Sequence, residues 1–334
     1  MTLAARLRLP VLIAALLLLV LGMPAFDSAI NSMAARGRLP LPDGLLNFST
    51  VFLGIVIEAM PFLLLGSLAS GLMAEFVSRD DLLAVIPKNP LLATLCGALI
   101  GMIFPACECG VVPLARRLRQ KGLPLSACVA LLLGAPVLNP IVIASTYAAF
   151  GSSVIFWGRL GFTLVIATGV GCLFLLVPED QVALPGNWRG HDHGERSSTG
   201  LRLGDRLGRA VQDAGTDFLD TARYLILGAL VATALQQFVS QSLLLSAGHG
   251  VAGNSLALIA LAYVLSVCST VDSFLALTFV NNVGAGPVVA FLVFGAMIDI
   301  KSTIMFLGLF RRRTVIYLIV ILALAALLAA LLVG

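Results

Sequence analysis

Long apolar stretches follow one another along most of the chain, separated by short polar or charged segments. Many of them reach the about 17 to 25 residues that a helix needs to cross a bilayer. They do not resemble barrel strands, which are alternating segments of about ten residues. We therefore predict membrane helices at 11–27, 48–75, 90–115, 124–149, 154–177, 214–243, 253–280, 286–310 and 314–333.

The composition supports an integral membrane protein. Hydrophobic residues make up 59% of the chain and charged residues only 11%, whereas soluble domains carry about 25% charged residues. The net charge of +4 lies in the loops, so it reports on topology, and no nucleic-acid partner is implied. The lipid bilayer is the partner that this composition requires, and a homo-oligomer is compatible with it.

The first apolar segment, 11–27, has two interpretations. It follows Arg6 and Arg8 and precedes small residues, a pattern shared by retained helices and cleaved signal peptides. We favour a retained helix, so residues 1–47 are predicted to form an N-terminal transmembrane helix and loop.

An internal duplication is the second large feature. Shifting the sequence by 161 residues places Cys107 on Cys268 and GAPVLNPIVI (134–143) on GAMIDIKSTI (295–304). A polar segment rich in arginine separates the two halves. We predict a first membrane repeat at 48–177, a cytoplasmic linker at 178–213 and a second membrane repeat at 214–334.

The arginines predict how the halves are oriented. The basic clusters 116–121 and 311–313 should both face the cytoplasm. They can do so only if the segments around the two cysteine motifs turn back inside the membrane. We predict an all-α polytopic bundle of two inverted repeats, each with a broken or re-entrant helical hairpin, giving about seven full spans plus two hairpins. Nine spans built from ordinary kinked helices are the alternative.

The first hairpin tip carries PACECGVVPLA (105–115). Pro105 and Gly110 predict a break in the helix, and in a locally extended chain Cys107 and Cys109 point the same way. On a regular helix they would lie about 200° apart, so an unwound tip is what allows two thiols to meet one ligand. Cys268, in the second motif SVCSTVDSFLA, would supply a third sulfur.

Three converging sulfurs suit a thiophilic centre such as trivalent arsenic, Cu(I) or zinc. Free buried cysteines are otherwise small hydrophobic residues, and we interpret Cys96, Cys128 and Cys172 in this way. We expect all six cysteines to be free thiols, since each lies in or beside an apolar segment.

Charged residues at membrane depth are costly, on the order of 2.5 to 3.5 kcal/mol each. Glu108 and Asp272 lie within the two tips, and we predict that they contact the substrate. Glu58, Asp299 and Lys301 are predicted coupling residues, because a proton-coupled carrier needs a carboxylate whose proton affinity is raised by desolvation. Lys301 can pair with a carboxylate on another helix, and a structural ion pair is the alternative role for these groups.

The segment GAPVLNP (134–140) places Asn139 between two prolines and predicts a second helix break. Carbonyl groups freed there could line a substrate pathway, while a plain proline kink is the alternative. His191 and His193 lack further ligands at a suitable spacing, so no metal site is predicted. No catalytic residues, nucleotide-binding motif or cofactor are predicted either.

The runs CECGVVPLARRL, KGLP and LLLGAPVLNPIVI resemble the predicted-permease family that contains the ArsP organoarsenical exporters and the YraQ-like permeases. The likeness covers most of 48–334, and PACECGVVP and GAPVLNP are its most specific parts. It implies a multi-pass permease of the bacterial inner membrane and, in one branch, efflux of trivalent organoarsenicals. By position, Cys107, Cys109 and Cys268 would be the thiol contacts.

The leading hypothesis is a protein that is not an enzyme but a secondary efflux transporter for a thiophilic solute such as a trivalent organoarsenical, with a central thiol and carboxylate site. One alternative is a transporter of a sulfur-containing anion or a metal ion. A membrane thiol oxidoreductase that cycles Cys107 and Cys109 between dithiol and disulfide is another. A non-transporting scaffold or complex subunit is the last.

Overall fold

The computed structural model describes residues 43–79, 82, 84, 86–102, 107–182, 203–238 and 250–334. The elements within this part of the chain are all α-helices, as the sequence predicts. The chain divides into two compact units, residues 1–58 and 59–334. The predicted first span, 11–27, lies outside the described residues, as do Pro105 and the two histidines near 192.

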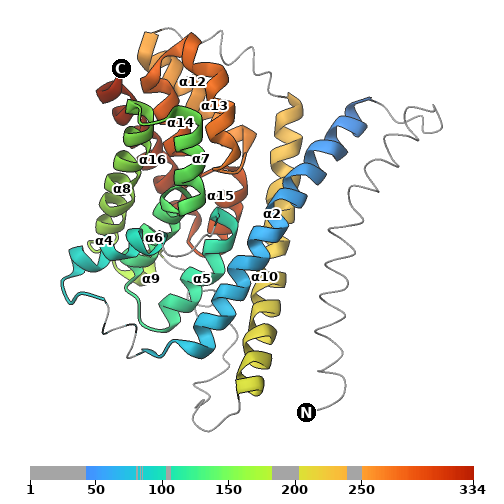
Figure 1. Cartoon of the computed structure of the whole chain (residues 1–334), viewed down its shortest axis with the longest axis vertical. Coiled ribbons are helices and arrows are strands. Elements are labelled where there is room, and N and C mark those ends of the chain that lie inside the picture. The colour runs from blue at the N-terminus through green and yellow to red at the C-terminus, as the bar shows by residue number, and fades with distance from the viewer. Residues whose placement is uncertain are drawn as a thin grey trace. The chain divides into compact units, whose positions relative to one another are not determined.

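The helices follow one another without an intervening sheet in the described ranges (Figure 1). In chain order they are α2 (Asp43–Phe76), α4 (Pro90–Ile100), α5 (Glu108–Gln120), α6 (Leu125–Leu138), α7 (Pro140–Phe150), α8 (Val154–Leu173), α9 (Glu179–Val182), α10 (Leu203–Phe238), α12 (Gly250–Leu265), α13 (Val271–Val283), α14 (Ala285–Met297), α15 (Ile300–Leu307) and α16 (Arg312–Val333).

Five stretches of the described chain are long and apolar enough to cross a membrane: 44–76, 154–173, 204–237, 285–307 and 312–333. The pair α6 and α7, bent by 41° at Asn139, makes a sixth if it is counted as one span. These six coincide with six of the full spans that the sequence predicts. The all-helical, multi-pass architecture is therefore confirmed.

The remaining two predicted segments, 90–115 and 253–280, are both interrupted at their cysteine motif. α4 and α5 are separated there in the first half, and α12 and α13 in the second. The carbonyl of Cys107 accepts hydrogen bonds from the amides three and four residues further on, and the carbonyl of Cys268 does the same. The two cysteine carbonyls thus share one hydrogen-bond pattern, although Cys107 is the N-cap of α5 and Cys268 lies two residues before Thr270, the N-cap of α13.

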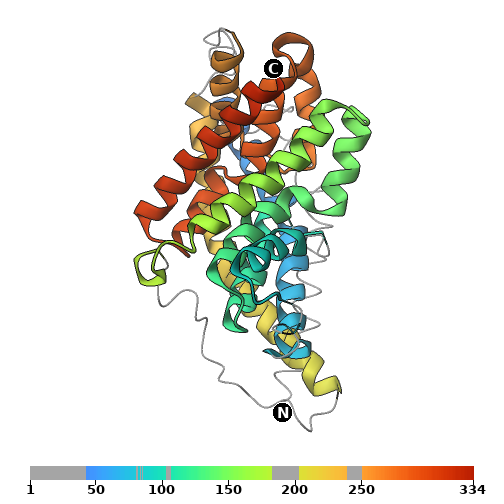
Figure 2. The ribbon, with the colours of Figure 1, turned by 90° about the vertical axis from the view of Figure 1, so that its left-hand side faces the viewer.

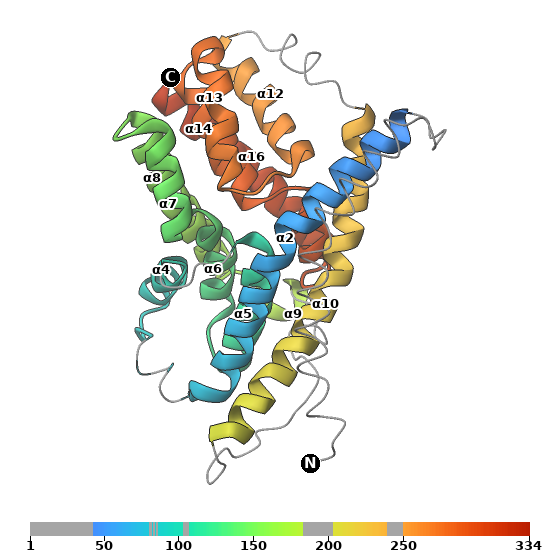
Figure 3. The ribbon, with the colours of Figure 1, turned by 45° about the vertical axis from the view of Figure 1, so that its right-hand side comes forward.

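The two halves pack in matching ways within the second unit. α4, α6 and α8 contact one another, and so do α12, α14 and α16, while α6 meets α14. α5 packs against α15 and α13 packs against α7. Each helix that starts after a cysteine motif therefore contacts a helix of the other half. Figure 3 shows α4 and α5 in the lower part of this unit and α12 and α13 in the upper part.

Part of the predicted linker is helical. α10 begins at Leu203, so residues 203–213 of the linker predicted at 178–213 are helical. Ion pairs attach this end of α10 to its neighbours: Arg209 Nη2 lies 3.0 Å from Glu75 Oε1 on α2, and Arg117 Nε of α5 lies 3.0 Å from Asp217 Oδ2. The linker's charges near its end therefore serve helix packing.

Glycines allow the closest helix contacts. A Cβ atom added to Gly66 of α2 would lie 2.3 Å from the Cα atom of Gly110 on α5. A Cβ atom at Gly97 of α4 would lie 2.3 Å from the carbonyl oxygen of Ala127 on α6. Small residues at such contacts are typical of membrane helices. Gly110 was expected to break the helix, but it lies inside α5 and serves this contact instead.

Replacement of Gly66 by alanine should destabilise the protein, because the added methyl group would overlap the backbone of α5. Overpacking of this kind costs about 1 to 3 kcal/mol. Gly169→Ala is the matched control, since a Cβ atom there meets nothing within 4 Å. Thermal unfolding in detergent checks this, and equal melting temperatures for Gly66→Ala and the wild type would contradict the tight α2–α5 contact.

Candidate functional site

Three of the predicted charged residues meet in the interior of the second unit. The Nζ atom of Lys301 lies 2.9 Å from Oε1 of Glu108 and 3.5 Å from Oδ2 of Asp299. Glu108 is 5% exposed, Asp299 0% and Lys301 3%. Lys301 stands on α15 and Glu108 on α5, so the predicted pairing of Lys301 with a carboxylate on another helix is observed. We call these three residues the charge cluster.

A break between α14 and α15 positions one side of the charge cluster. Ile298 and Asp299 are in extended conformation, and Asp299 is the N-cap of α15. Its Oδ1 atom accepts a 2.7 Å hydrogen bond from the amide of Ser302, whose Oγ accepts a 2.7 Å bond from the Asp299 amide. This reciprocal capping box fixes the carboxylate, so Asp299 satisfies a helix end and also faces Lys301.

Ser266 connects the charge cluster to the second cysteine motif. Its hydroxyl donates a 2.6 Å hydrogen bond to Oδ2 of Asp299 and accepts a 3.3 Å bond from the Lys301 amide. Ser266 is buried and has a φ of 53°, a left-handed conformation that is rare for a residue other than glycine. A continuous polar path thus runs from the start of α5, through the charge cluster, to the segment that precedes Cys268.

The thiols of the first motif converge by a different route from the one expected. Cys107 is extended, but the helix begins at Glu108, so Cys109 lies in the first turn of α5 and not in an unwound tip. The two side chains are nonetheless close enough to interact across the first turn of α5, although Cys107 makes no side-chain capping hydrogen bond. Both are buried. The expectation of an extended chain at Cys109 was wrong, whereas the proximity of the two thiols is observed.

Cys268 has its own contact, a 3.3 Å approach of its Sγ atom to the hydroxyl of Thr270. Among the described residues, no group of three or more histidine, cysteine, aspartate or glutamate side chains is arranged to hold a metal ion. The convergence of Cys268 with Cys107 and Cys109 on one ligand stays a prediction.

Asp272 has a partner that sequence reasoning missed. The Nη2 atom of Arg159 lies 3.0 Å from Oδ1 and 3.2 Å from Oδ2 of Asp272. Arg159, on α8, is 0% exposed, and it also donates to the hydroxyls of Ser273 at 2.6 Å and Thr146 at 2.9 Å. The sequence did contain an indication of this pair. Arg159 is the one charged residue in the apolar segment 154–177, and a charge at membrane depth usually has a partner or a function.

The other two predicted residues are Asn139, which caps a helix, and Glu58, which belongs to the first unit. Asn139 forms the predicted break, and its side-chain oxygen accepts a 2.9 Å hydrogen bond from the Val142 amide as the N-cap of α7. Its contact with a substrate stays a prediction. Glu58 is half-buried on α2 in the first unit, and its coupling role also stays a prediction.

The charge balance of the cluster is its main chemical property. Two carboxylates share one ammonium group, so ionised side chains leave one negative charge uncompensated. Burial of such a charge is unfavourable, and binding of a proton or another cation relieves it. In contrast, Arg159 and Asp272 balance one another. The charge cluster is thus suited to cation exchange and the Arg159 pair to holding helices together.

Replacement of Arg159 by methionine should destabilise the protein by about 3 to 5 kcal/mol, because it leaves the Asp272 carboxylate buried without its partner. The double variant Arg159→Met/Asp272→Leu should recover much of this loss. Thermal unfolding of the wild type, both single variants and the double variant gives the coupling energy. Additive effects of the two single changes would contradict a direct ion pair.

Comparison with known proteins supplies the family. The model of a predicted permease family, ArsP_1, matches residues 44–334. The "UPF0718 protein YcgR" of Bacillus subtilis is 42% identical over 290 residues, which cover 86% of this chain and 97% of that protein. No solved structure matches the chain.

Two further relatives are similar over different lengths. A "Putative two-component membrane permease complex subunit" of Streptococcus mutans is 34% identical over 83% of this chain and 91% of its own length. The "UPF0718 protein YraQ" of Escherichia coli is 29% identical over 30% of this chain and 28% of its own length.

Membership of a permease family implies a transporter and not an enzyme. With its helical, multi-pass architecture and a family match from residue 44 to residue 334, the chain belongs to the ArsP_1 family of predicted permeases.

Proposed function

We propose that this permease is a secondary transporter that exports a thiophilic solute, such as a trivalent organoarsenical, through a site made of the Cys107 and Cys109 thiols and the charge cluster. One observation carries the proposal. Glu108 lies between the two cysteines in sequence and is joined to Lys301, on a helix of the other half, over 2.9 Å. A ligand held by the thiols is therefore linked directly to an ion pair between the halves.

The inverted-repeat interpretation supports this mechanism. Residues 48–177 and 214–334 are the proposed repeats. Each contributes one helix that also contacts the other, α5 against α15 and α13 against α7, as two inverted copies would. Glu108–Lys301 and Asp272–Arg159 are both ion pairs between the proposed repeats. Rocking of one repeat against the other would expose the thiols to each side of the membrane in turn.

Proton exchange is the proposed coupling. Protonation of Glu108 removes the uncompensated negative charge and weakens the contact with Lys301, which then remains paired with Asp299 at 3.5 Å. The start of α5, and the two thiols with it, is then less tightly held by the other repeat. Entry of a proton at Glu108 could thus drive release of cargo, which makes Glu108, Asp299 and Lys301 coupling residues.

Cargo binding needs no redox chemistry. A trivalent arsenical that carries hydroxyl groups forms each As–S bond from one thiol and one As–OH group, with release of one water molecule and no change in oxidation state. Hydrolysis reverses the step at the opposite side. Two adjacent thiols therefore suffice for capture, and Cys268 would add a third contact.

The bacterial inner membrane is the proposed location, and the relatives are bacterial proteins. The amide of Arg311 donates a 2.9 Å hydrogen bond to the Val182 carbonyl of α9, which places the basic cluster 311–313 beside α9. Figure 3 shows α9 and α5, whose last turn bears the other basic cluster, in the same lower part of the second unit. This arrangement supports a common cytoplasmic side for both clusters.

A second candidate is favoured by the Streptococcus mutans relative, which is described as a putative subunit of a two-component membrane permease complex. In this case the chain would transport only with a second subunit, and its cargo could equally be a sulfur-containing anion or a metal ion. Transport by the purified chain alone, reconstituted in vesicles, would exclude this candidate.

Cys107→Ser and Cys109→Ser should each abolish most of the resistance to methylarsenite that the wild-type chain confers on a sensitive bacterial host, because each removes one As–S bond. Cys172→Ser, on α8, is the matched control and should protect as well as the wild type. Growth at graded arsenical concentrations measures the effect, with membrane levels checked by immunoblot. No protection by the wild type would contradict the arsenical cargo.

Glu108→Gln should lower the rate of pH-gradient-driven export from proteoliposomes about tenfold or more. Binding of a phenylarsenical to the thiols should persist. In this variant the positive charge of Lys301 is still balanced by the negative charge of Asp299, so the protein should fold normally. Asp220→Asn is the control, because Asp220 pairs only with Arg223 at 3.4 Å among the ion pairs of the described residues. Gradient-driven export at the wild-type rate by Glu108→Gln would contradict the coupling role.

A further inference from the structure

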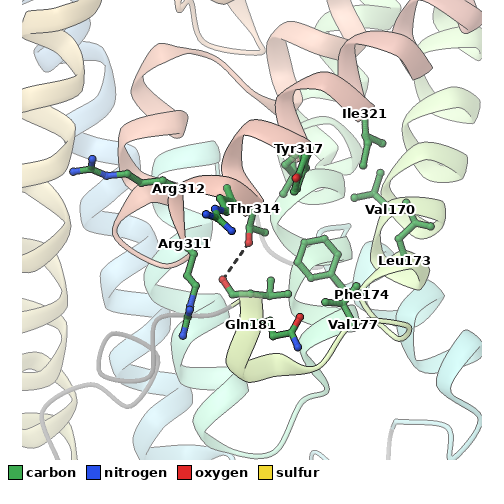
Figure 4. Close-up of a pocket in the computed structure, with 13 residues that line it drawn as sticks. Val170, Leu173, Phe174, Val177, Gln181, Arg311, Arg312, Thr314, Tyr317 and Ile321 are labelled. Atoms are coloured by element: carbon green, nitrogen blue, oxygen red, sulfur yellow. Dashed lines mark hydrogen bonds between the residues drawn. The ribbon is translucent and has the colours of Figure 1, made fainter.

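A cavity of about 810 Å³ lies between the end of α8, the short helix α9 and the start of α16. Figure 2 shows α8 and α16 side by side, with α9 at the end where they meet. The cavity has two chemically different sides. In Figure 4, Arg311 and Arg312 lie on one side and Val170, Leu173 and Ile321 on the other. Neither the charge cluster nor the cysteine motifs contribute to it.

The basic side is well suited to a phosphate group. Three arginines, 311–313, line the cavity, and no ion pair found among the described side chains involves any of them. They stand at the beginning of α16, where no side chain caps the helix. The first amides of a helix lack intrahelical partners and carry the positive end of the helix dipole. Guanidinium groups bind phosphate oxygens in a bidentate manner.

The apolar side of the cavity favours a phospholipid over a free phosphate ion. α8 and α16 are both candidate membrane spans, so a cavity at their ends lies where a bilayer surface would be. A free phosphate ion would leave Val170, Leu173 and Ile321 in contact with water. An acyl chain would cover them, and basic pockets between membrane helices on the cytoplasmic side are known to accept anionic lipid headgroups.

We propose that this cavity binds an anionic phospholipid, with its phosphodiester at Arg311–Arg313 and an acyl chain along the apolar side. The bound lipid would connect α8, the last long helix before the linker, to α16. It would thereby hold the two halves together at the end from which the linker leaves. This role is separate from the transport site and does not depend on the identity of the cargo.

Thermal unfolding of the purified full-length chain in detergent tests the proposal. Added phosphatidylglycerol should raise the melting temperature by several degrees, whereas phosphatidylcholine and millimolar inorganic phosphate should not. The triple variant Arg311→Lys/Arg312→Lys/Arg313→Lys should lose at least half of this shift, since lysine keeps the positive charge that sets the topology but not the bidentate geometry. Native mass spectrometry should show at least threefold less retained phosphatidylglycerol on this variant.

Two further variants make the test specific. Ile321→Phe should reduce the shift by filling the apolar side, while Arg223→Lys, at an exposed arginine outside the cavity, should leave it unchanged. An equal shift with phosphatidylcholine would show bulk lipid solvation, and an equal shift with inorganic phosphate would show a simple anion site. Either result, or an unchanged response of the triple lysine variant, would overturn the proposal.

Discussion

The need to pair a buried ammonium group organises the centre of this permease. Lys301 is almost fully enclosed and lies within reach of two carboxylates, Glu108 and Asp299. An isolated charge in such a place is strongly unfavourable, so the segments that carry its partners must remain in register with α15. The start of α5, the start of α15 and the segment before Cys268 are all tied to this one group. Cys107 and Cys109 flank Glu108, so the ion pair with Lys301 also fixes the position of the two thiols.

Broken helices make this arrangement feasible. The ends of α12 and α14 and the starts of α5, α7 and α15 expose amide and carbonyl groups that need partners, which only protein or a water-filled cavity can provide at membrane depth. Asn139 and Asp299 satisfy the starts of α7 and α15 with their own side chains. Polar side chains at these breaks face the protein interior. A continuous apolar helix would not place them there. Polar chemistry and helix breaks therefore occur together.

The two ion pairs between the proposed repeats differ in a way that fits a transporter. Arg159 and Asp272 are balanced and further bonded to Ser273 and Thr146, so they behave as a fixed contact. The charge cluster has one carboxylate in excess and lies beside two thiols. A permease needs one contact that keeps its halves together and another that changes when a ligand or an ion binds. The balanced Arg159–Asp272 pair fits the first role, and the charge cluster, with its excess negative charge, fits the second.

The sequence by itself determined the helical, multi-pass class, the positions of six spans, the interruptions at the cysteine motifs and at Asn139, and the family. These features depend on local properties: the length of apolar stretches, and prolines or polar residues that interrupt them. It also singled out Glu108, Asp299 and Lys301, because charge at membrane depth is conspicuous. Only the tertiary structure decided which carboxylate meets Lys301, that Arg159 is the partner of Asp272, and that Gly110 serves packing and not a break. Those contacts join residues more than forty positions apart in sequence, and local pattern contains no information about which distant helix face will be opposite.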